Sequence, residues 1–346
     1  MHNIKIGSRN IGEGRPCFII AEAGSNHNRK LDLAFQLIDI AKESGADAVK
    51  FQSFKADKHY PKIKSNKPGK SSYEITKNKE LPEEWIPKLS RYCKERDILF
   101  MSSVFYDEAV DILNPYVSVF KIASSEMTHY PLIQYAHGTG KPLIISTGMA
   151  DLSEVNGLVD MLEGLKMNKP KNYVLLHCTV SYPADFADAN LRAIEVMRKR
   201  YDVPIGISDH TRDPLVVPVA AVALGANLIE KHFTISNSLP GADHSYALEP
   251  DELKNMVKAV RDAELALGSG KKKAAGVEIK LKRYLRRAIF AVKDIAAGQA
   301  LSAENIDILR SADKKGGLDP KEYFNIIGKK TKRSIKAYAP IRKEFL

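Results

Sequence analysis

Residues 204–233 have the sequence PIGISDHTRDPLVVPVAAVALGANLIEKHF. This stretch contains two short apolar runs, Pro204–Ser208 and Leu228–Phe233, on either side of a longer apolar segment, Pro214–Leu224. Short runs of this kind are typical of buried strands, and the segment between them is long enough for a helix. The stretch therefore predicts a strand, a helix and a second strand parallel to the first.

The same alternation extends toward the N-terminus through most of the chain. Further strand-like runs are Cys17–Glu22, Asp47–Gln52, Ile98–Ser102, Val117–Ile122, Pro142–Ser146 and Tyr173–Cys178. Helices are expected at Leu31–Ser44, Glu83–Arg96, Asp107–Leu113, Pro131–Gly138, Leu152–Leu165, Leu191–Arg200, Pro214–Leu224 and Asp251–Leu267. Eight strands and eight helices in roughly 250 residues predict an α/β fold, the (β/α)8 TIM barrel. A doubly wound open sheet is disfavoured, because Gly24-Ser25-Asn26-His27 after the first run is not a glycine-rich phosphate loop.

The composition changes after the last predicted helix. Gly268-Ser269-Gly270 is followed by three lysines, which is typical of the end of a domain. We therefore expect the barrel at residues 1–268, a linker at 269–285 and a small C-terminal domain at 286–346. The polar stretch Ala56–Lys79 predicts a long loop on the C-terminal face of the barrel.

The overall composition is that of a folded globular protein, with 44% hydrophobic and 27% charged residues. No apolar run is long enough for a membrane span, and the N-terminus lacks the apolar core of a signal peptide, so we expect a cytoplasmic protein with no membrane partner. The three cysteines are too few and too scattered for a disulfide framework or a zinc cluster.

The positive charge of the chain is concentrated near its C-terminus. Of the net charge of +11, residues 271–346 contribute 20 Lys+Arg against 8 Asp+Glu, or +12, which leaves 33 against 34, or −1, for the rest. This basic segment contains no zinc-finger spacing, RNP-like motif or basic zipper. Attraction for an acidic substrate is therefore favoured over nucleic-acid binding.

Polar side chains follow or end each predicted strand, which is where the active sites of TIM barrels lie. They are Glu22, Lys50, Gln52, Ser102, Ser103, Lys121, Ser124, Ser146, Thr179, Tyr182, Ser208, His210, Glu230 and His232. Residues two apart on a strand share a face. We therefore expect Lys50 to lie beside Gln52, and His232 beside Glu230.

His210 and His232 end neighbouring strands, where two neutral imidazoles could bind one divalent cation together with a carboxylate or water. The alternative, that each is an ordinary hydrogen-bonding residue, stays open. His27, His177 and His244 are weaker candidates for metal ligands and are more typical of structural or substrate-binding histidines.

Lys50 and Lys121 lie within otherwise apolar strands, where an unpaired charge would be costly. A phosphate or carboxylate is the expected partner, helped by hydroxyl groups of Ser103, Ser124, Ser146 and Ser208. Two alternatives remain. Each lysine could pair with a carboxylate of the barrel, such as Glu22, Glu126 or Glu230, or one lysine could form a Schiff base as in aldolases.

At these same positions the sequence resembles the family of sialic acid synthases (N-acetylneuraminate synthases) and their relatives that make pseudaminic, legionaminic and other nonulosonic acids. The strings that carry the resemblance are Ile20–His27, Gly45–Gln52, Phe120–Ser124, Ile145–Met149, Leu176–Thr179, Tyr182-Pro183, Gly206–His210, Glu230–Thr234 and Gly241–Ser245. From about Arg286 onward the sequence is similar to the antifreeze-like SAF domain of this family.

The resemblance implies that C3 of phosphoenolpyruvate attacks the aldehyde of an open-chain N-acetylated amino sugar, after which water adds at C2 and phosphate leaves. His210 and His232 would bind the metal, with Mn²⁺ favoured over Mg²⁺ or Co²⁺, and Glu22 would transfer a proton. The residues implied to bind phosphoenolpyruvate are Lys50, Ser103, Lys121, Ser124, Ser146 and Ser208. Those implied to bind the sugar are Gln52, Tyr182, Glu230, Asp243 and Arg310.

Arg310 is similar to a family arginine that reaches the active site of a partner subunit, which implies a domain-swapped homodimer. The segment after it, Ser311 to Gly316, departs from the usual Pro-Gly-x-Gly. Val180 is a second departure, because sialic acid synthases commonly have a polar residue there. Two rival functions remain: a Schiff-base pyruvate aldolase on the same barrel, and a polyanion- or carbohydrate-binding protein that uses the basic C-terminal domain.

Overall fold

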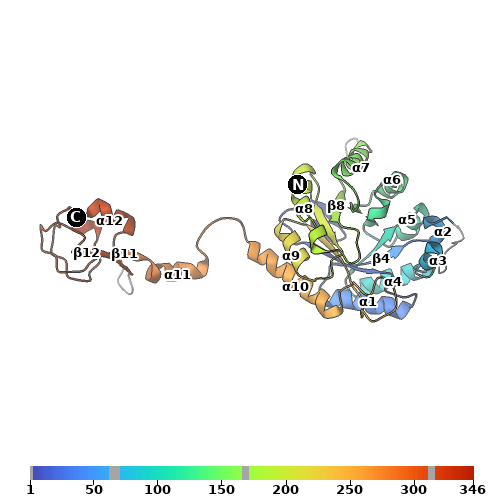
Figure 1. Cartoon of the computed structure of the whole chain (residues 1–346), viewed down its shortest axis with the longest axis horizontal. Coiled ribbons are helices and arrows are strands. Elements are labelled where there is room, and N and C mark those ends of the chain that lie inside the picture. Colours follow the sequence, from blue (N-terminus) through green and yellow to red (C-terminus); the bar gives the residue numbers. More distant parts are fainter. Residues whose placement is uncertain (1–2, 62–70, 166–170, 311–315) are drawn as a thin grey trace. The chain divides into compact units, whose positions relative to one another are not determined.

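The computed structural model describes residues 3–61, 71–165, 171–310 and 316–346 of the chain. The chain divides into two compact units, Met1–Gly268 and Ser269–Leu346, each with its own hydrophobic core (Figure 1). The first unit contains all the strands of the parallel sheet, and the second contains a separate antiparallel pair.

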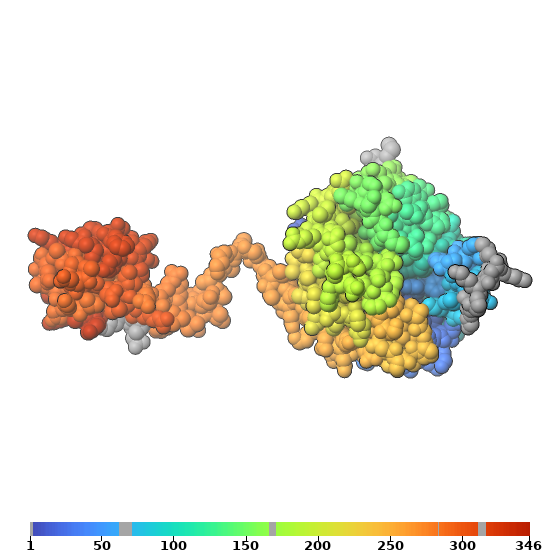
Figure 2. Space-filling view, in the orientation of Figure 1, coloured from blue at the N-terminus to red at the C-terminus, as the bar shows by residue number. Residues whose placement is uncertain are grey.

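The first unit is a closed parallel barrel in which the strand order is β10-β3-β4-β5-β6-β7-β8-β9. The strands are β3 (Phe18–Gly24), β4 (Ala48–Ser53), β5 (Leu99–Val104), β6 (Phe120–Ile122), β7 (Leu143–Ser146), β8 (Tyr173–Cys178), β9 (Ile205–Asp209) and β10 (Leu228–His232). Closure is made by β10 and β3, whose register pairs Leu228 with Phe18 and His232 with Glu22. Figure 2 shows the colours following one another around this unit in chain order, as expected for a barrel. The predicted TIM-barrel fold is confirmed.

Helices surround the strands on the outside of the barrel (Figure 1). They are α1 (Leu31–Glu43), α4 (Ile86–Glu95), α5 (Asp107–Leu113), α6 (Tyr130–Gly138), α7 (Leu152–Gly164), α8 (Arg192–Arg200), α9 (Val216–Ala223) and α10 (Pro250–Leu267). Strand residues that face outward, such as Ile19, Val49 and Ile229, are fully buried in one hydrophobic core together with apolar residues of the helices. This layer explains why the strands read as continuous apolar runs, since both faces of a parallel sheet are covered.

The barrel interior is apolar at the N-terminal ends of the strands and polar at the C-terminal ends. An N-terminal hairpin, β1 (Ile4–Ile6) and β2 (Arg9–Ile11), was not predicted from the sequence. Its three isoleucines join one buried cluster with inward-facing residues Phe18, Ile20, Ala48, Met101, Val119, Ile144, Val174, Leu176 and Leu228. The hairpin therefore closes the N-terminal end of the barrel, which leaves the C-terminal end for the polar side chains.

The stretch Ala56–Lys79, predicted as a loop, contains two short helices among its described residues. These are α2 (Ala56–His59) and α3 (Ser72–Lys77); residues 62–70 lie outside the described part. Helix α3 begins with a capping box, in which the Ser71 hydroxyl accepts from the Glu74 backbone N–H and the Glu74 carboxylate accepts from the Ser71 N–H. Reciprocal capping of this kind stabilises even a short helix.

The second unit begins with α11 (Gly276–Leu285), which lies in the stretch predicted to be a linker. An antiparallel pair follows, β11 (Arg287–Ala291) and β12 (Ile306–Arg310), with Arg287 opposite Arg310. Its core is small and rich in isoleucine: Ile289, Ala291, Ile295, Leu301, Ile306, Ile326, Ile335 and Ile341. Short helical segments also occur near the C-terminus, including α12 (Tyr323–Ile326).

In the ranges that the structure covers, no helix combines the length and the apolar character needed to cross a membrane. Cys17, Cys93 and Cys178 are all buried free thiols. Burial raises the pKa of each thiol, so the three behave as small apolar side chains.

Candidate active site

A cavity of about 100 Å³ opens at the C-terminal ends of the barrel strands. All of the residues implied for the active site except Asp243 and Arg310 line it: Glu22, Lys50, Gln52, Ser103, Lys121, Ser124, Ser146, Tyr182, Ser208, His210, Glu230 and His232. They come from every strand of the barrel or from the segment directly after it. The alternation of strand side chains therefore delivers one polar residue after another to the same cavity.

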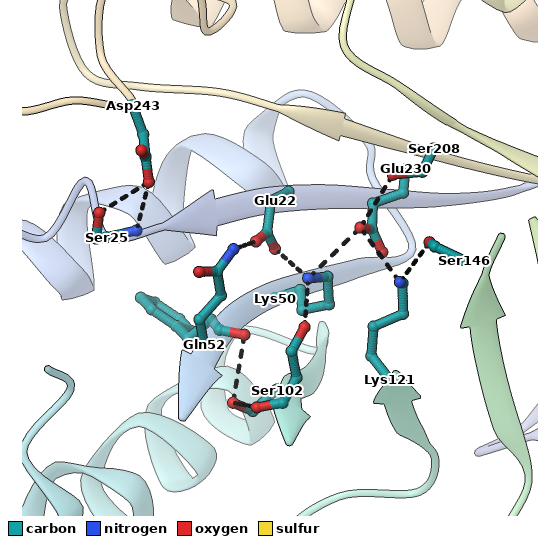
Figure 3. A network of polar contacts seen from close by, with 12 residues as sticks. Glu22, Ser25, Lys50, Gln52, Ser102, Lys121, Ser146, Ser208, Glu230 and Asp243 are labelled. Atoms are coloured by element: carbon teal, nitrogen blue, oxygen red, sulfur yellow. Dashed lines mark hydrogen bonds and ion pairs between the residues drawn. The ribbon is translucent and has the colours of Figure 1, made fainter. Parts of the chain in front are cut away.

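Two lysines and two glutamates form the centre of the site (Figure 3). The Lys50 Nζ lies 2.8 Å from Glu22 Oε2 and 3.5 Å from Glu230 Oε1, and it donates to Ser103 Oγ at 2.8 Å. Lys121 Nζ donates to Ser146 Oγ at 2.6 Å and lies 3.9 Å from Glu230 Oε1. Both lysines therefore lie within 4 Å of a barrel carboxylate, as one of the alternatives stated above expects.

The two glutamates differ in their affinity for a proton. Burial raises the pKa of the Glu22 carboxyl to about 7, although the Lys50 ammonium works in the opposite direction. For Glu230 burial also acts to raise the pKa, but Lys121 and Lys50 together outweigh it and hold the pKa below its usual value. Burial lowers the pKa of Lys121. Near neutral pH, Glu230 is thus ionised, and Glu22 binds a proton more readily than Glu230 does.

Gln52 fixes the position of the Glu22 carboxylate. Its Nε2 donates to Glu22 Oε1 at 2.6 Å, while the other oxygen of Glu22 faces Lys50. Ser208 contributes a longer contact on the other side of the cavity, from its Oγ to Glu230 Oε1 at 3.4 Å. Each carboxylate is therefore oriented by at least one neutral hydrogen-bond donor as well as by lysine (Figure 3).

His210 and His232 lie on one side of the cavity with ring centroids 5.5 Å apart. The Nδ1 of His210 donates to the Thr179 carbonyl oxygen at 2.7 Å, so the lone pair is on Nε2, which lies 3.5 Å from Ser208 Oγ. Burial lowers the pKa of both rings, that of His232 to about 3 with His210 as the second cause. Both imidazoles are therefore neutral, which is the form that binds metal ions.

The two histidines fit a divalent cation. Among the described residues His232 Nδ1 is a buried atom without a hydrogen-bond partner, and so is Glu230 Oε2. No cluster of three or more His, Cys, Asp or Glu side chains suited to a metal occurs in the described part of the chain. A cation at this position would thus take the remaining ligands from water or substrate.

Aromatic rings cover the histidines. The ring of Tyr182 lies 4.2 Å from that of His210, and Tyr246 lies 5.3 Å from His232, measured between centroids. Tyr182 and Tyr246 also contact one another, at 5.2 Å. Tyr246 was not predicted as a site residue, because it belongs to the irregular segment after β10, which no pattern marks as part of the cavity.

Asp243 lies next to the cavity and not in its lining. Its Oδ2 accepts hydrogen bonds from the Ser25 hydroxyl at 2.8 Å and from the Ser25 backbone N–H at 3.3 Å (Figure 3). Gly24 lies between Asp243 and His232, with φ +53°, and a Cβ there would be 3.0 Å from Asp243 Oδ2. Glycine is therefore required for the close approach of these two side chains.

Met149 and Val180 add an apolar edge to the cavity. Met149 is 69% exposed and has φ +66°, which is unusual for any residue but glycine. Ser125, Ala123 and Cys178 also line the cavity without having been predicted. The signal for Met149 is absent from the sequence, because a backbone angle of this kind cannot be inferred from a methionine.

Several strand-end candidates face elsewhere. Ser102 is fully buried and shares a hydrogen bond with Ser53 at 2.8 Å. His27 Nδ1 accepts from the Arg29 N–H, His177 Nε2 contacts the Ala189 carbonyl, and His244 Nδ1 contacts Thr234 Oγ1. None of these histidines lines the cavity.

Arg310 ends β12 in the second unit and is exposed there. The departure from the family pattern after it falls on residues 311–315, which lie outside the described part of the chain.

A larger cavity, of about 840 Å³, lies at the N-terminal end of the barrel strands. Its charged groups are largely paired with one another: Asp47 contacts Arg9 and Arg261, and Arg261 also contacts Glu264 at 3.1 Å. Since the N-terminal face of TIM barrels serves stability and the C-terminal face serves catalysis, we place the active site in the smaller cavity.

The barrel and this cavity together define the class of protein: a TIM-barrel enzyme whose site combines buried lysines, carboxylates and a pair of neutral histidines. Residues 37–272 match the model of the NeuB family, and residues 286–346 match the SAF domain. The chain belongs to the NeuB family.

Individual relatives agree with this assignment over nearly the whole chain. The chain is 43% identical to N,N'-diacetyllegionaminic acid synthase of Legionella pneumophila, covering 96% of this chain and 95% of the relative. The crystal structure of the spore coat polysaccharide biosynthesis protein SpsE from Bacillus subtilis is similar, with a TM-score of 0.69, 39% identity and 99% of both chains covered. A sialic acid synthetase from Leptospira borgpetersenii, in complex with citrate, has a TM-score of 0.74 and 34% identity over 82% of this chain and 96% of that one.

Proposed function

We propose that this protein is a nonulosonic acid synthase, a transferase that condenses phosphoenolpyruvate with an N-acetylated amino sugar and releases phosphate. The observation that carries the proposal is the convergence of two buried lysines and two neutral histidines in one cavity at the C-terminal ends of the strands. Membership of the NeuB family supports the same reaction class.

The lysines are the proposed binding groups for phosphoenolpyruvate. Lys50 and Lys121 are each 2% exposed, so their charges act in an environment where water screens little. Ser103 and Ser146 already bond to the two ammonium groups. With Ser124 and Ser208 they would donate to the phosphate and carboxylate oxygens, while Glu22 and Glu230 offset part of the charge of the two lysines.

The cofactor proposed for the site is a divalent metal cation, Mn²⁺ in preference to Mg²⁺ or Co²⁺. His210 and His232 would hold it, and the cation would supply Lewis-acid activation of the aldehyde oxygen of the sugar. The Thr179 carbonyl keeps the proton of His210 on Nδ1, so Nε2, whose contact with Ser208 Oγ is a long one of 3.5 Å, carries the lone pair that would bind the cation.

The carboxylates are assigned to the sugar and to proton transfer. Glu22 is the candidate for proton transfer, since it lies in the cavity between Gln52 and Lys50. Together with Gln52, the residues proposed to hold the sugar hydroxyl and acyl groups are Tyr182, Glu230, Asp243 and Arg310. We further propose that Arg310 is supplied by the partner in a domain-swapped homodimer.

In the proposed reaction the enol carbon C3 forms a bond to the aldehyde carbon of the open-chain sugar. The oxygen of a water molecule then bonds to C2. The bond between C2 and the phosphate oxygen breaks, and inorganic phosphate leaves. The accepting sugar is proposed to be N-acetylmannosamine or a 2,4-diacetamido-trideoxyhexose. Similarity to the Legionella pneumophila enzyme and the apolar Val180 at the cavity edge favour the second.

The test is an assay of the purified full-length protein with phosphoenolpyruvate, Mn²⁺ and each sugar separately. We expect release of phosphate and a product whose mass equals that of sugar plus pyruvate. His232→Ala should abolish turnover and leave the protein folded with a cooperative thermal unfolding transition, because the ring lies in the cavity and outside the hydrophobic clusters of the barrel. Phosphate release by His232→Ala at the wild-type rate would remove the metal role.

The lowered pKa of Lys121 also suits a Schiff-base aldolase, so the same assay must exclude that function. An aldolase would use pyruvate, survive EDTA and form an adduct that borohydride traps. We expect no trapped adduct, and loss of activity with EDTA that Mn²⁺ restores.

A further inference from the structure

Lys231 lies between two residues of the proposed active site and yet faces away from the cavity. Glu230 and His232 line the cavity, and alternate residues of a strand point to opposite sides, so Lys231 projects from the outer face of β10. It is only 2% exposed. In the register of the barrel it is paired with Asp209, the last residue of β9.

The Lys231 ammonium is surrounded by acceptors from one short segment. It lies 2.6 Å from Asp209 Oδ2, 3.2 Å from Thr211 Oγ1 and 3.1 Å from the Asp213 carbonyl oxygen, and it also donates to the Thr211 carbonyl. The second oxygen of Asp209 accepts from the Thr211 N–H and hydroxyl, each at 2.8 Å. Residues 209–213 are thus wrapped around a single buried charge.

Both histidines are sequence neighbours of the residues in this ion pair. His210 lies within the wrapped segment, directly after Asp209, and His232 directly follows Lys231. The ring of His210 also donates to the Thr179 carbonyl oxygen and packs against the ring of Tyr182. The ion pair therefore joins the two stretches of backbone from which the imidazoles project, on the side opposite to the cavity.

We propose that the buried pair of Lys231 and Asp209 is a positioning device that fixes the spacing of His210 and His232 for binding one divalent cation. Neither side chain touches the ion or the substrates. The inference rests on the metal role proposed above, and it adds residues outside the cavity that set the affinity for the metal. A ligand pair with imposed spacing loses less freedom when the cation binds, so loosening the pair weakens binding without removing a ligand.

A double variant, Asp209→Asn with Lys231→Met, removes both charges and nearly preserves volume. The matched control is Asp47→Asn with Arg261→Met, which removes an ion pair of 2.9 Å at the opposite end of the barrel. Mn²⁺ binding to the full-length proteins is measured from the electron paramagnetic resonance signal of free Mn²⁺, together with the thermal midpoint. We expect the Kd for Mn²⁺ to rise by about 10- to 100-fold in the first variant, and to change little in the control, where the ion pair lies far from both histidines.

If the double variant does not fold, a milder variant allows the same test. Thr211→Val removes the hydroxyl that contacts both Asp209 and Lys231, while the ion pair remains, and a smaller rise in the Kd is expected. Wild-type affinity in the folded variants would overturn the inference, and so would an equal loss in the control. Absence of Mn²⁺ binding by the wild-type protein would instead defeat the proposed metal role, and this inference with it.

Discussion

Met149 combines an unfavourable backbone conformation with an exposed side chain at the edge of the cavity. A residue with a Cβ costs about 1–2 kcal/mol in the left-handed region. The 69% exposed side chain recovers little of this cost by packing. Strain that packing does not require is typical of positions held for function. We interpret Met149 as an apolar contact for the bound sugar, next to Val180.

Met149→Gly should separate stability from function. Because glycine adopts positive φ freely, we expect the free energy of unfolding in urea to increase by about 1 kcal/mol. The KM for the sugar should rise several-fold while the KM for phosphoenolpyruvate changes little. Met149→Ala is the control: it keeps the strain and removes the contact, so only the KM should change. Unchanged stability and unchanged KM in the glycine variant would contradict this interpretation.

Individual site residues differ in how far the sequence predicts them. Lysines and histidines at strand ends stand out because apolar strands seldom contain them, and the structure brings Lys50, Lys121, His210 and His232 to one cavity. The pairing of both lysines with glutamate does not follow from the sequence, because sequence does not give distances. Tyr246 was missed because its place depends on the path of an irregular segment.

Regular elements were predicted within a few residues where they are long enough to repeat a pattern. Strand β8 and helix α5 have the predicted bounds, and the other barrel strands differ from the prediction by at most three residues at either end. Elements with few residues were missed, including β1, β2 and α2. Three or four residues are too few to show a period. For α3 a signal does exist in the spacing of Ser71 and Glu74, which is that of a capping box.

Gly206 in β9 tests how tightly the barrel interior is filled. A Cβ there would overlap the Leu228 carbonyl oxygen and lie 2.8 Å from Leu176 Cδ2, so neighbouring strands would have to separate. We expect Gly206→Ala to lower the free energy of unfolding by about 1–3 kcal/mol, measured by urea denaturation. Gly164→Ala at the end of α7 is the control, because nothing lies within 4 Å of its added Cβ. Equal stability of the two variants would argue against a close-packed strand interface.

The two units of the molecule differ in net charge. The region from residue 271 onward, which contributes +12, belongs to the second unit, so the barrel is close to neutral. The change of composition after Gly268 coincides with this division, and the NeuB model ends shortly after it, at residue 272, while the SAF model begins at residue 286. Composition does not reveal whether the basic unit acts on its own barrel or, as proposed, on that of a partner subunit.

Subunit complementation tests the proposed homodimer. Arg310→Ala should raise the KM for the sugar and leave phosphoenolpyruvate binding nearly unchanged, while His232→Ala should be inactive. Mixing the two variants under conditions of subunit exchange should restore up to about one quarter of the wild-type activity, because half of the dimers are mixed and each has one intact site. Recovery requires that Arg310 act on the neighbouring subunit. No recovery, with exchange verified by native mass spectrometry, would place Arg310 in its own subunit's site or outside any site.

Pairing of the first barrel strand with the last has a consequence for how the protein is made. Glu22 emerges from the ribosome long before His232, its register partner across the closing seam. Until translation has passed β10, the nascent chain can hold neither the closed cylinder nor the complete set of cavity side chains. The complete cavity can therefore form only after β10 has been synthesised. We expect a chain that ends before this strand to have no activity.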